Sequence, residues 1–129
     1  MQKPFYSILI LMFIVSCHAT KNTIQSESNT TLSAIAKKPA TYEGKEVKLD
    51  ADFLGWKYAD CKFPKSFSSV QITRSDWVIQ EGKWCCFVTG TVPKGLDPAS
   101  ANRVPVKLTA VVKLKDSKVY LEVVTIVLK

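Results

Sequence analysis

Hydrophobic and polar residues alternate along two long segments of the chain. In residues 46–53 apolar residues take every second position and charged residues take the others. In residues 104–114 apolar residues again take every second position, from Val104 to Leu114. A period of two is typical of a β-strand with one buried face, so both segments are predicted to be half-buried strands.

Three shorter segments are also predicted to be strands. Residues 70–80 and 84–89 form a candidate pair with a turn at Glu81–Gly82–Lys83, and residues 119–128 follow a turn at Asp116–Ser117. Only residues 32–38, which end at Pro39, and residues 96–101 have the composition of short helices. The pattern therefore predicts an all-β domain of five strands.

The order of these elements matches an OB-type barrel, which has five strands and a helix or loop between the third and fourth. Gly55 follows the first strand at the place where such barrels bend a strand. Residues 32–129 resemble small bacterial domains related to the nucleic-acid-binding OB family, in which a lead-in like residues 39–44 precedes the first strand. The resemblance implies a five-stranded antiparallel OB-like barrel with a short helical lead-in. A β-sandwich is the alternative fold.

The N-terminus has the pattern of a secretory signal. A basic start is followed by the apolar residues 5–15 and a small residue before Cys17. This run is shorter than the roughly twenty residues that a membrane-spanning helix needs. Ile14, Ser16 and Cys17 resemble the lipobox of bacterial lipoproteins, which implies cleavage before Cys17 and stable anchoring through its acyl chains. The alternative is an ordinary cleavage after Ala19.

Composition divides the chain into three parts. Residues 1–16 are predicted to be a signal peptide, residues 17–31 a lipidated cysteine and flexible tether rich in Asn, Ser and Thr, and residues 32–129 a single domain. We expect the mature protein outside the cytoplasm, on the outer membrane where the bacterium has one. His18, the second mature residue, is not the aspartate that retains lipoproteins at the inner membrane.

The formal net charge of +7 falls to +6 when Lys3 leaves with the signal peptide. This charge favours an anionic envelope component as partner. Lysines on the polar faces of strands also keep a small β domain soluble, which is the simpler explanation. Another envelope protein is a further candidate partner. Nucleic acid is not expected, because a lipoprotein domain outside the cytoplasm rarely meets it.

The OB resemblance implies a ligand face on the second and third strands. The candidate binding residues there are Arg74, Asp76, Trp77 and Trp84, and alternation predicts a charge-assisted pair between Arg74 and Asp76. A tryptophan on this face could stack on a ligand, although core packing is the commoner role. Trp56, beside the predicted bend, is expected to be the most structural of the three tryptophans.

Three cysteines remain after lipidation of Cys17, so one disulfide and one free thiol are expected in an oxidising compartment. Neighbouring strand residues point to opposite faces, so Cys85 and Cys86 do not both reach Cys61. The spacing leaves open which of them does. The resemblance to related domains implies a disulfide between Cys61 and Cys85, with Cys86 a small buried hydrophobic residue.

The domain lacks the residues of a conventional catalytic site. It contains no histidine and no glycine-rich phosphate loop, and Asp50 and Asp52 lie on the polar face of their strand. Adjacent strand cysteines diverge, which disfavours a metal site, and there is no Cys-x-x-Cys motif. We therefore expect a binding or structural module with no enzymatic activity, cofactor or metal. The alternative is an envelope thiol-redox or metal-handling protein that uses Cys61, Cys85 and Cys86.

Overall fold

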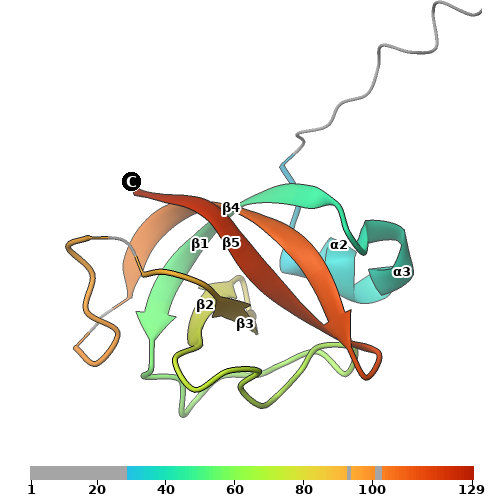
Figure 1. Ribbon diagram of the computed structural model, residues 1–129, viewed down its shortest axis with the longest axis horizontal. Coiled ribbons are helices and arrows are strands. Elements are labelled where there is room, and N and C mark those ends of the chain that lie inside the picture. The colour runs from blue at the N-terminus through green and yellow to red at the C-terminus, as the bar shows by residue number, and fades with distance from the viewer. Residues whose placement is uncertain (1–28, 93, 101–102) are drawn as a thin grey trace, which may run out of the picture.

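Five strands close into a barrel in the computed structural model, which describes residues 29–92, 94–100 and 103–129 (Figure 1). Around the barrel the order is β1-β2-β3-β5-β4, and β4 pairs back with β1. The predicted fold class, an all-β OB-like barrel of five strands, is confirmed. The strands are β1 (Glu46–Gly55), β2 (Trp77–Glu81), β3 (Trp84–Thr89), β4 (Val104–Lys115) and β5 (Lys118–Leu128).

The sheet is mixed, so the prediction of a wholly antiparallel barrel was wrong at one junction. β3 and β5 are parallel and pair only as Val88 with Leu121 and Thr89 with Glu122. The direction follows from the other pairings. Antiparallel pairing of β1 with both β2 and β4 gives β2 and β4 the same direction, and each is followed by a strand antiparallel to it. β3 and β5 must therefore run the same way.

Two short helices precede the barrel and form the helical lead-in that was predicted. They are α2 (Leu32–Lys37) and α3 (Pro39–Tyr42). The Thr31 hydroxyl accepts a hydrogen bond from the Ala34 N–H and caps α2, and Leu32 and Ile35 are buried in the barrel core. The second predicted helix, at residues 96–101, is absent from its described part, where residues 98–100 form a turn. There the Asp97 carboxylate accepts a hydrogen bond from the Ala99 N–H and stabilises the turn.

β1 bends at Gly55, as the sequence indicated. The register with β2 shifts between Phe53 and Gly55, and Gly55 has φ +62°. A Cβ atom at this position would lie 2.4 Å from the carbonyl oxygen of Pro98. Only glycine therefore fits both the backbone conformation and the close approach of residue 98.

β2 begins later than predicted, because residues 70–76 form a loop rather than the start of a strand. The Asp76 carboxylate accepts hydrogen bonds from the N–H groups of Ile72 and Thr73, at 2.6 and 2.8 Å, and from the Thr73 hydroxyl. These bonds fold the chain back on itself just before β2. An aspartate that binds nearby backbone N–H groups favours a turn over an extended strand.

The interior of the barrel contains the inward side chains of all five strands together with those of α2, and we call it the inner core. Trp77 and Phe53 are its largest fully buried members, with ring centroids 5.1 Å apart. The buried members are Leu32, Ile35, Val47, Leu49, Ala51, Phe53, Phe67, Trp77, Ile79, Cys86, Val88, Val106, Leu108, Ala110, Val112, Val119 and Leu121.

Candidate functional site

The outer face of β2 and β3, where OB barrels usually bind ligands, is covered in this protein. Val78, Cys85 and Phe87 are buried on this outer face beside Leu54 of β1, and residues of the β1–β2 loop (residues 56–76) pack over them. We call this group the outer cluster. Its partly buried loop members are Tyr58, Cys61 and Phe63.

Two aromatic rings of the loop contact Phe87. The Phe63 ring stacks on it with the centroids 5.2 Å apart and the planes 5° from parallel. The Tyr58 ring meets it edge-on, also at 5.2 Å. Both geometries are favourable for aromatic pairs. The loop therefore has its own apolar contact with the barrel wall.

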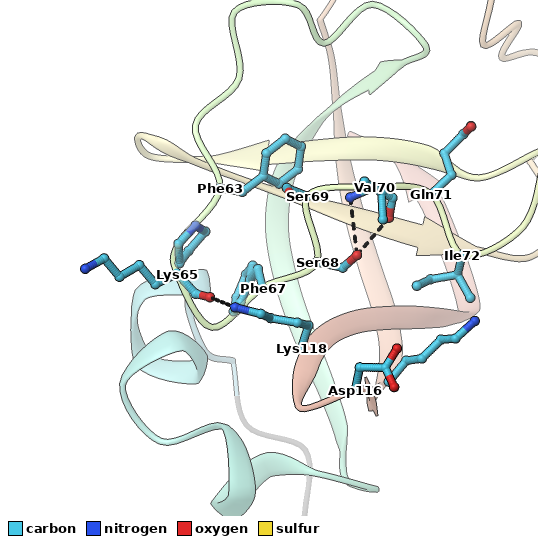
Figure 2. Close-up of a pocket in the computed structure, with 12 residues that line it drawn as sticks. Phe63, Lys65, Phe67, Ser68, Ser69, Val70, Gln71, Ile72, Asp116 and Lys118 are labelled. Carbon is cyan, nitrogen blue, oxygen red and sulfur yellow. Dashed lines mark hydrogen bonds between the residues drawn. The ribbon is translucent and has the colours of Figure 1, made fainter.

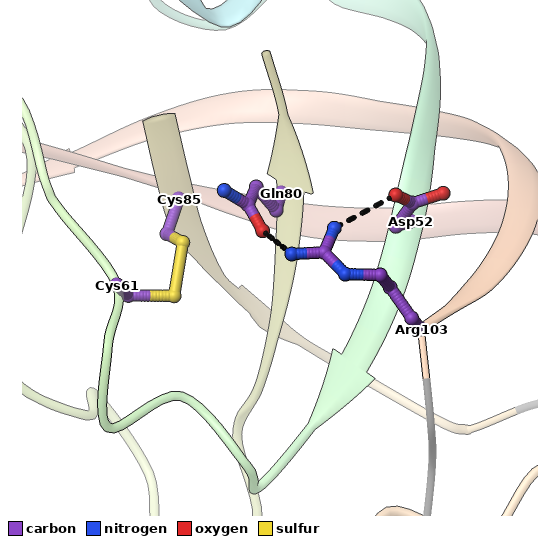
Figure 3. The surroundings of a disulfide bond; sticks show 5 residues. All are labelled: Asp52, Cys61, Gln80, Cys85 and Arg103. Carbon is purple, nitrogen blue, oxygen red and sulfur yellow. Dashed lines mark hydrogen bonds and ion pairs between the residues drawn. A yellow bond between two sulfur atoms is a disulfide. The ribbon is translucent and has the colours of Figure 1, made fainter. Parts of the chain in front are cut away.

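A disulfide fixes the loop to β3 by joining Cys61 and Cys85, whose Cα atoms are 5.8 Å apart (Figure 3). This is the pair that the family resemblance implied. The Cys85 N–H also donates to the Lys62 carbonyl at 2.9 Å, so the main chain is attached beside the disulfide. The loop is thus held over β3 by a covalent bond and a hydrogen bond.

Cys86 points the other way, into the inner core, and is the free cysteine of the described residues. Complete burial raises the pKa of the Cys86 thiol far above its ordinary value, because the thiolate would lose its hydration. The thiol therefore stays protonated and is a poor nucleophile. In the described part of the chain no three His, Cys, Asp or Glu side chains gather as metal ligands would.

The four predicted binding residues do not form a common face. Trp77 is fully buried in the inner core, where its Nε1 donates to the Gly90 carbonyl at 3.1 Å. Asp76 is fully buried in the loop, and Trp84 is partly buried against the inner core, with the Lys83 ammonium 4.9 Å from its ring centroid. The predicted face was therefore wrong for Asp76 and Trp77.

The predicted ion pair between Arg74 and Asp76 is also absent from the described structure. Arg74 is exposed, whereas the Asp76 carboxylate bonds to Ile72 and Thr73. The prediction relied on strand alternation. These residues lie in a turn, where alternation does not apply.

The accessible polar site on this side of the barrel is centred on Arg103, which the sequence did not single out. One terminal nitrogen of its guanidinium donates to Asp52 Oδ2 at 3.1 Å and the other to Gln80 Oε1 at 2.7 Å (Figure 3). Asp52 and Gln80 are directly paired across β1 and β2, and Gln80 is paired with Cys85. Arg103 thus lies over Asp52 and Gln80, which form a polar row next to Cys85 of the outer cluster.

Trp56 lies beside Arg103 in a groove of about 440 Å³. Its side chain is 47% exposed, so the prediction that Trp56 is the most structural tryptophan was wrong. Its main chain is fixed all the same, because the Trp56 N–H donates to the Pro98 carbonyl at 2.9 Å. We call this site the Arg103 groove. Its lining residues are Leu54, Trp56, Lys57, Tyr58, Ala59, Asp60, Cys61, Gln80 and Arg103.

A second hollow, of about 650 Å³, lies between the β1–β2 loop and the turn that joins β4 to β5 (Figure 2). Lys65, Lys115 and Lys118 give it positive charge, beside Asp116. The Lys118 ammonium donates to the Lys65 carbonyl at 2.6 Å and so connects β5 to the loop. This lysine therefore has a structural contact, and the hollow has no exposed aromatic ring comparable with Trp56.

The predicted signal peptide, Cys17 and most of the tether fall within residues 1–28, outside the described residues. The last predicted tether residues, 29–31, contact the barrel. Asn29 forms a bridge with Lys48, and the Thr30 N–H donates to the Lys48 carbonyl at 3.0 Å. No helix among the described residues has the length and apolar character needed to cross a bilayer.

Comparison with known protein families, with curated proteins and with solved structures finds no match to this chain.

Proposed function

We propose that this chain is a membrane-anchored lipoprotein outside the cytoplasm, whose OB-like barrel is a non-enzymatic binding or structural module of the cell envelope. The short apolar run that ends at Cys17 supports the anchor. A disulfide between Cys61 and Cys85 agrees with an oxidising compartment, because such bonds are rare in the cytosol. The first sixteen residues are then the signal peptide.

The observation that carries the binding role is the Arg103 groove. It presents a half-exposed tryptophan ring beside a guanidinium that two side chains hold in place. A guanidinium has five N–H donors, so two hydrogen bonds leave donors for a ligand. Trp56 offers an apolar ring face to a flat ligand, and Arg103 offers charge-assisted hydrogen bonds to a carboxylate. A sugar ring that bears a carboxylate combines both properties.

We therefore propose an acidic saccharide of the envelope as the ligand. Nucleic acid fits less well, because the outer face of β2 and β3 is occupied by Tyr58 and Phe63 rather than open for stacked bases. The net charge of +6 that remains after loss of Lys3 agrees with an anionic partner, either an acidic saccharide or a nucleic acid.

Calorimetric titration of the protein with a uronic-acid oligosaccharide, and with its neutral counterpart, tests the ligand. We expect binding of the acidic form alone, and an affinity loss of about tenfold or more for Trp56→Ala and for Arg103→Ala. Lys83→Ala, an exposed change outside the groove, is the control and should bind as the parent does. Equal affinity in all three variants would refute the groove as the site.

Mass spectrometry of the protein purified from a bacterial membrane tests the anchor. Diacylglycerol on Cys17 is the expected result, and Cys17→Ser should release the protein from the membrane fraction. A mature N-terminus at Thr20 would instead show ordinary cleavage after Ala19 and contradict the lipoprotein proposal.

No observation favours the thiol-redox or metal-handling alternative. Cys61 and Cys85 are bonded to each other, and burial keeps the Cys86 thiol protonated.

A further inference from the structure

On the side that faces β3, β5 is paired along only part of its length. Residues 66–68 cover its start, where the Ser68 N–H donates to the Val119 carbonyl, and β3 covers Leu121 and Glu122. Beyond Glu122, nothing in the described ranges pairs with this edge, and β5 continues past β3 toward the C-terminus (Figure 1). Residues 123–128 therefore form an open strand edge.

This edge is apolar and exposed. Val124, Val127 and Leu128 are 49%, 58% and 53% exposed, and they are three of the five large apolar side chains that lie exposed among the described residues. A shallow hollow of about 510 Å³ lies along the edge and is lined by residues 90–91 and 122–126. Most proteins protect such an edge with a charge or a proline, and residues 125–128 contain neither.

The hydrogen bonds to β4 indicate which main-chain groups of the edge are unused. The Lys129 N–H donates to the Pro105 carbonyl, so the intervening pair of Leu128 with Val106 is not hydrogen-bonded. Antiparallel alternation then directs the N–H and C=O groups of Ile126 and Leu128 away from β4, toward the open side. A bulge at Val124 interrupts the alternation, so the usable edge lies after it.

We propose that this edge pairs with the same edge of a second copy of the chain, antiparallel and about a two-fold axis beside Val127. Ile126 of each copy then lies opposite Leu128 of the other, with their N–H and C=O groups bonded to each other. Val127 faces Val127 of the second copy. Such an interface is self-complementary, as two-fold symmetry requires, and extends the sheet by strand addition.

The charges along β5 favour the antiparallel arrangement of two copies. In the proposed register Lys129 of each copy lies opposite Thr125 of the other, whereas parallel pairing would place the two Lys129 side chains side by side. Like charges directly across two strands destabilise the pair.

Cysteine cross-linking of the full chain tests the geometry, in a Cys17→Ser background that leaves the buried Cys86 as the other free thiol. Residues facing each other in a pair without hydrogen bonds have Cα atoms about 4.5 Å apart, which a disulfide spans. Val127→Cys should therefore oxidise to a covalent dimer. Lys107→Cys is the control, because Lys107 lies on β4, directly opposite Val127 and one strand farther from the edge. This variant should remain largely monomeric. No dimer from Val127→Cys, or equal dimer from both variants, would overturn the proposal.

Sedimentation equilibrium of the full Cys17→Ser chain tests the interface without a cross-link. The chain should dimerise with rising concentration, and Leu128→Pro should abolish the dimer by removing an edge N–H while leaving the bonds to β4 intact. Val70→Ala, at another exposed apolar residue, should dimerise as before. A thermal midpoint of Leu128→Pro close to that of the parent would show that the variant is folded. A parent that stays monomeric would refute the proposal, and so would a dimeric Leu128→Pro.

Discussion

The inner core and the outer cluster meet at two adjacent residues of β3, yet they are stabilised in different ways. Cys86 faces the interior and belongs to the inner core, to which all five strands and α2 contribute side chains. Cys85 faces outward, where four buried residues lie under one loop and a disulfide fixes that loop. The inner core depends on the burial of many side chains, whereas the outer cluster adds a covalent bond to a small apolar contact.

The comparison shows that one part of the outer face of β2 and β3 is covered and another part carries an accessible polar site. The loop covers the apolar part of the outer face with Tyr58, Cys61 and Phe63, and Arg103 lies over the neighbouring polar residues Asp52 and Gln80. Both the disulfide and the Arg103 contacts reach residues on neighbouring strands, Cys85 and Gln80. Substitutions in the two regions therefore measure how much burial, the disulfide and a surface ion pair each contribute to the free energy of unfolding.

The largest effect is expected from Trp77→Ala. It removes a fully buried ring and a hydrogen bond to Gly90, and should lower the free energy of unfolding by about 3–5 kcal/mol. Trp56→Ala is the matched control, because that ring is half exposed, and should change stability by about 0.5 kcal/mol or less. Denaturant unfolding measures both. Similar losses in the two variants would contradict the assignment of Trp77 to the core.

The disulfide should come next. Replacing Cys61 and Cys85 together by alanine should cost about 3 kcal/mol, because the bond closes a segment in which the cysteines are 24 positions apart. Hydrogen exchange should show a loss of amide protection in the loop, for example at the N–H of residue 61, which donates to the Tyr58 carbonyl. The amides of β1 and β4 should remain protected under native conditions. Equal loss of protection in those strands would mean that the two regions unfold as one unit.

Cys86 should make stability depend on pH in alkaline solution. Burial raises the pKa of its thiol above the ordinary value of 9.0, so above about pH 9 the unfolded chain releases a proton that the folded chain keeps. The stabilisation from the protonated Cys86 thiol is complete below about pH 9. Above that pH the free energy of unfolding falls by about 1.4 kcal/mol per pH unit because of this thiol. Unfolding curves of the parent and of Cys86→Ala between pH 8 and pH 11 isolate it by difference. A difference that does not change with pH would show that the thiol is hydrated.

Arg103→Ala should have the smallest effect on stability, below about 1 kcal/mol. Its ion pair with Asp52 is exposed, with side-chain accessibilities of 57% and 35%, and water screens such pairs. Denaturant unfolding beside Lys113→Ala, which removes another exposed pair, with Glu122, provides the comparison. A much larger loss for Arg103→Ala would mean that its side chain stabilises the loop as well as the groove.

Alternation in the sequence predicted the inner core well because β1 and β4 have one buried and one exposed face. Alternation and turn residues together predicted the five strands, whereas the bend at Gly55 and the helical lead-in followed from the OB resemblance and from the composition of residues 32–38. Alternation failed at residues 70–76, because the hydrogen bonds of Asp76 outweigh the extended tendency of the neighbouring apolar residues. The parallel junction between β3 and β5 was missed because it depends on the directions of all the strands together.

The candidate site was much harder to predict. Arg103 and Gln80 are 23 positions apart, and Arg103 and Asp52 are 51 apart, so no local pattern connects them. One signal for the outer cluster was present. β3 carries apolar or cysteine residues on both faces, which is unusual for a strand with a solvated side and indicates that something covers it.

The parallel junction of β3 and β5 has a consequence for the order of folding. β4 and β5 are joined by a two-residue turn in which Asp116 and Ser117 both have positive φ, as tight hairpins require, so their contacts are local and form quickly. Val88 must instead find Leu121 across the whole of β4, at a greater cost in chain entropy. β1 and β4 are also paired over a long sequence separation. We expect these two long-range junctions to form last and to limit the folding rate, so that the strand edges of the nascent chain stay uncovered until the barrel closes.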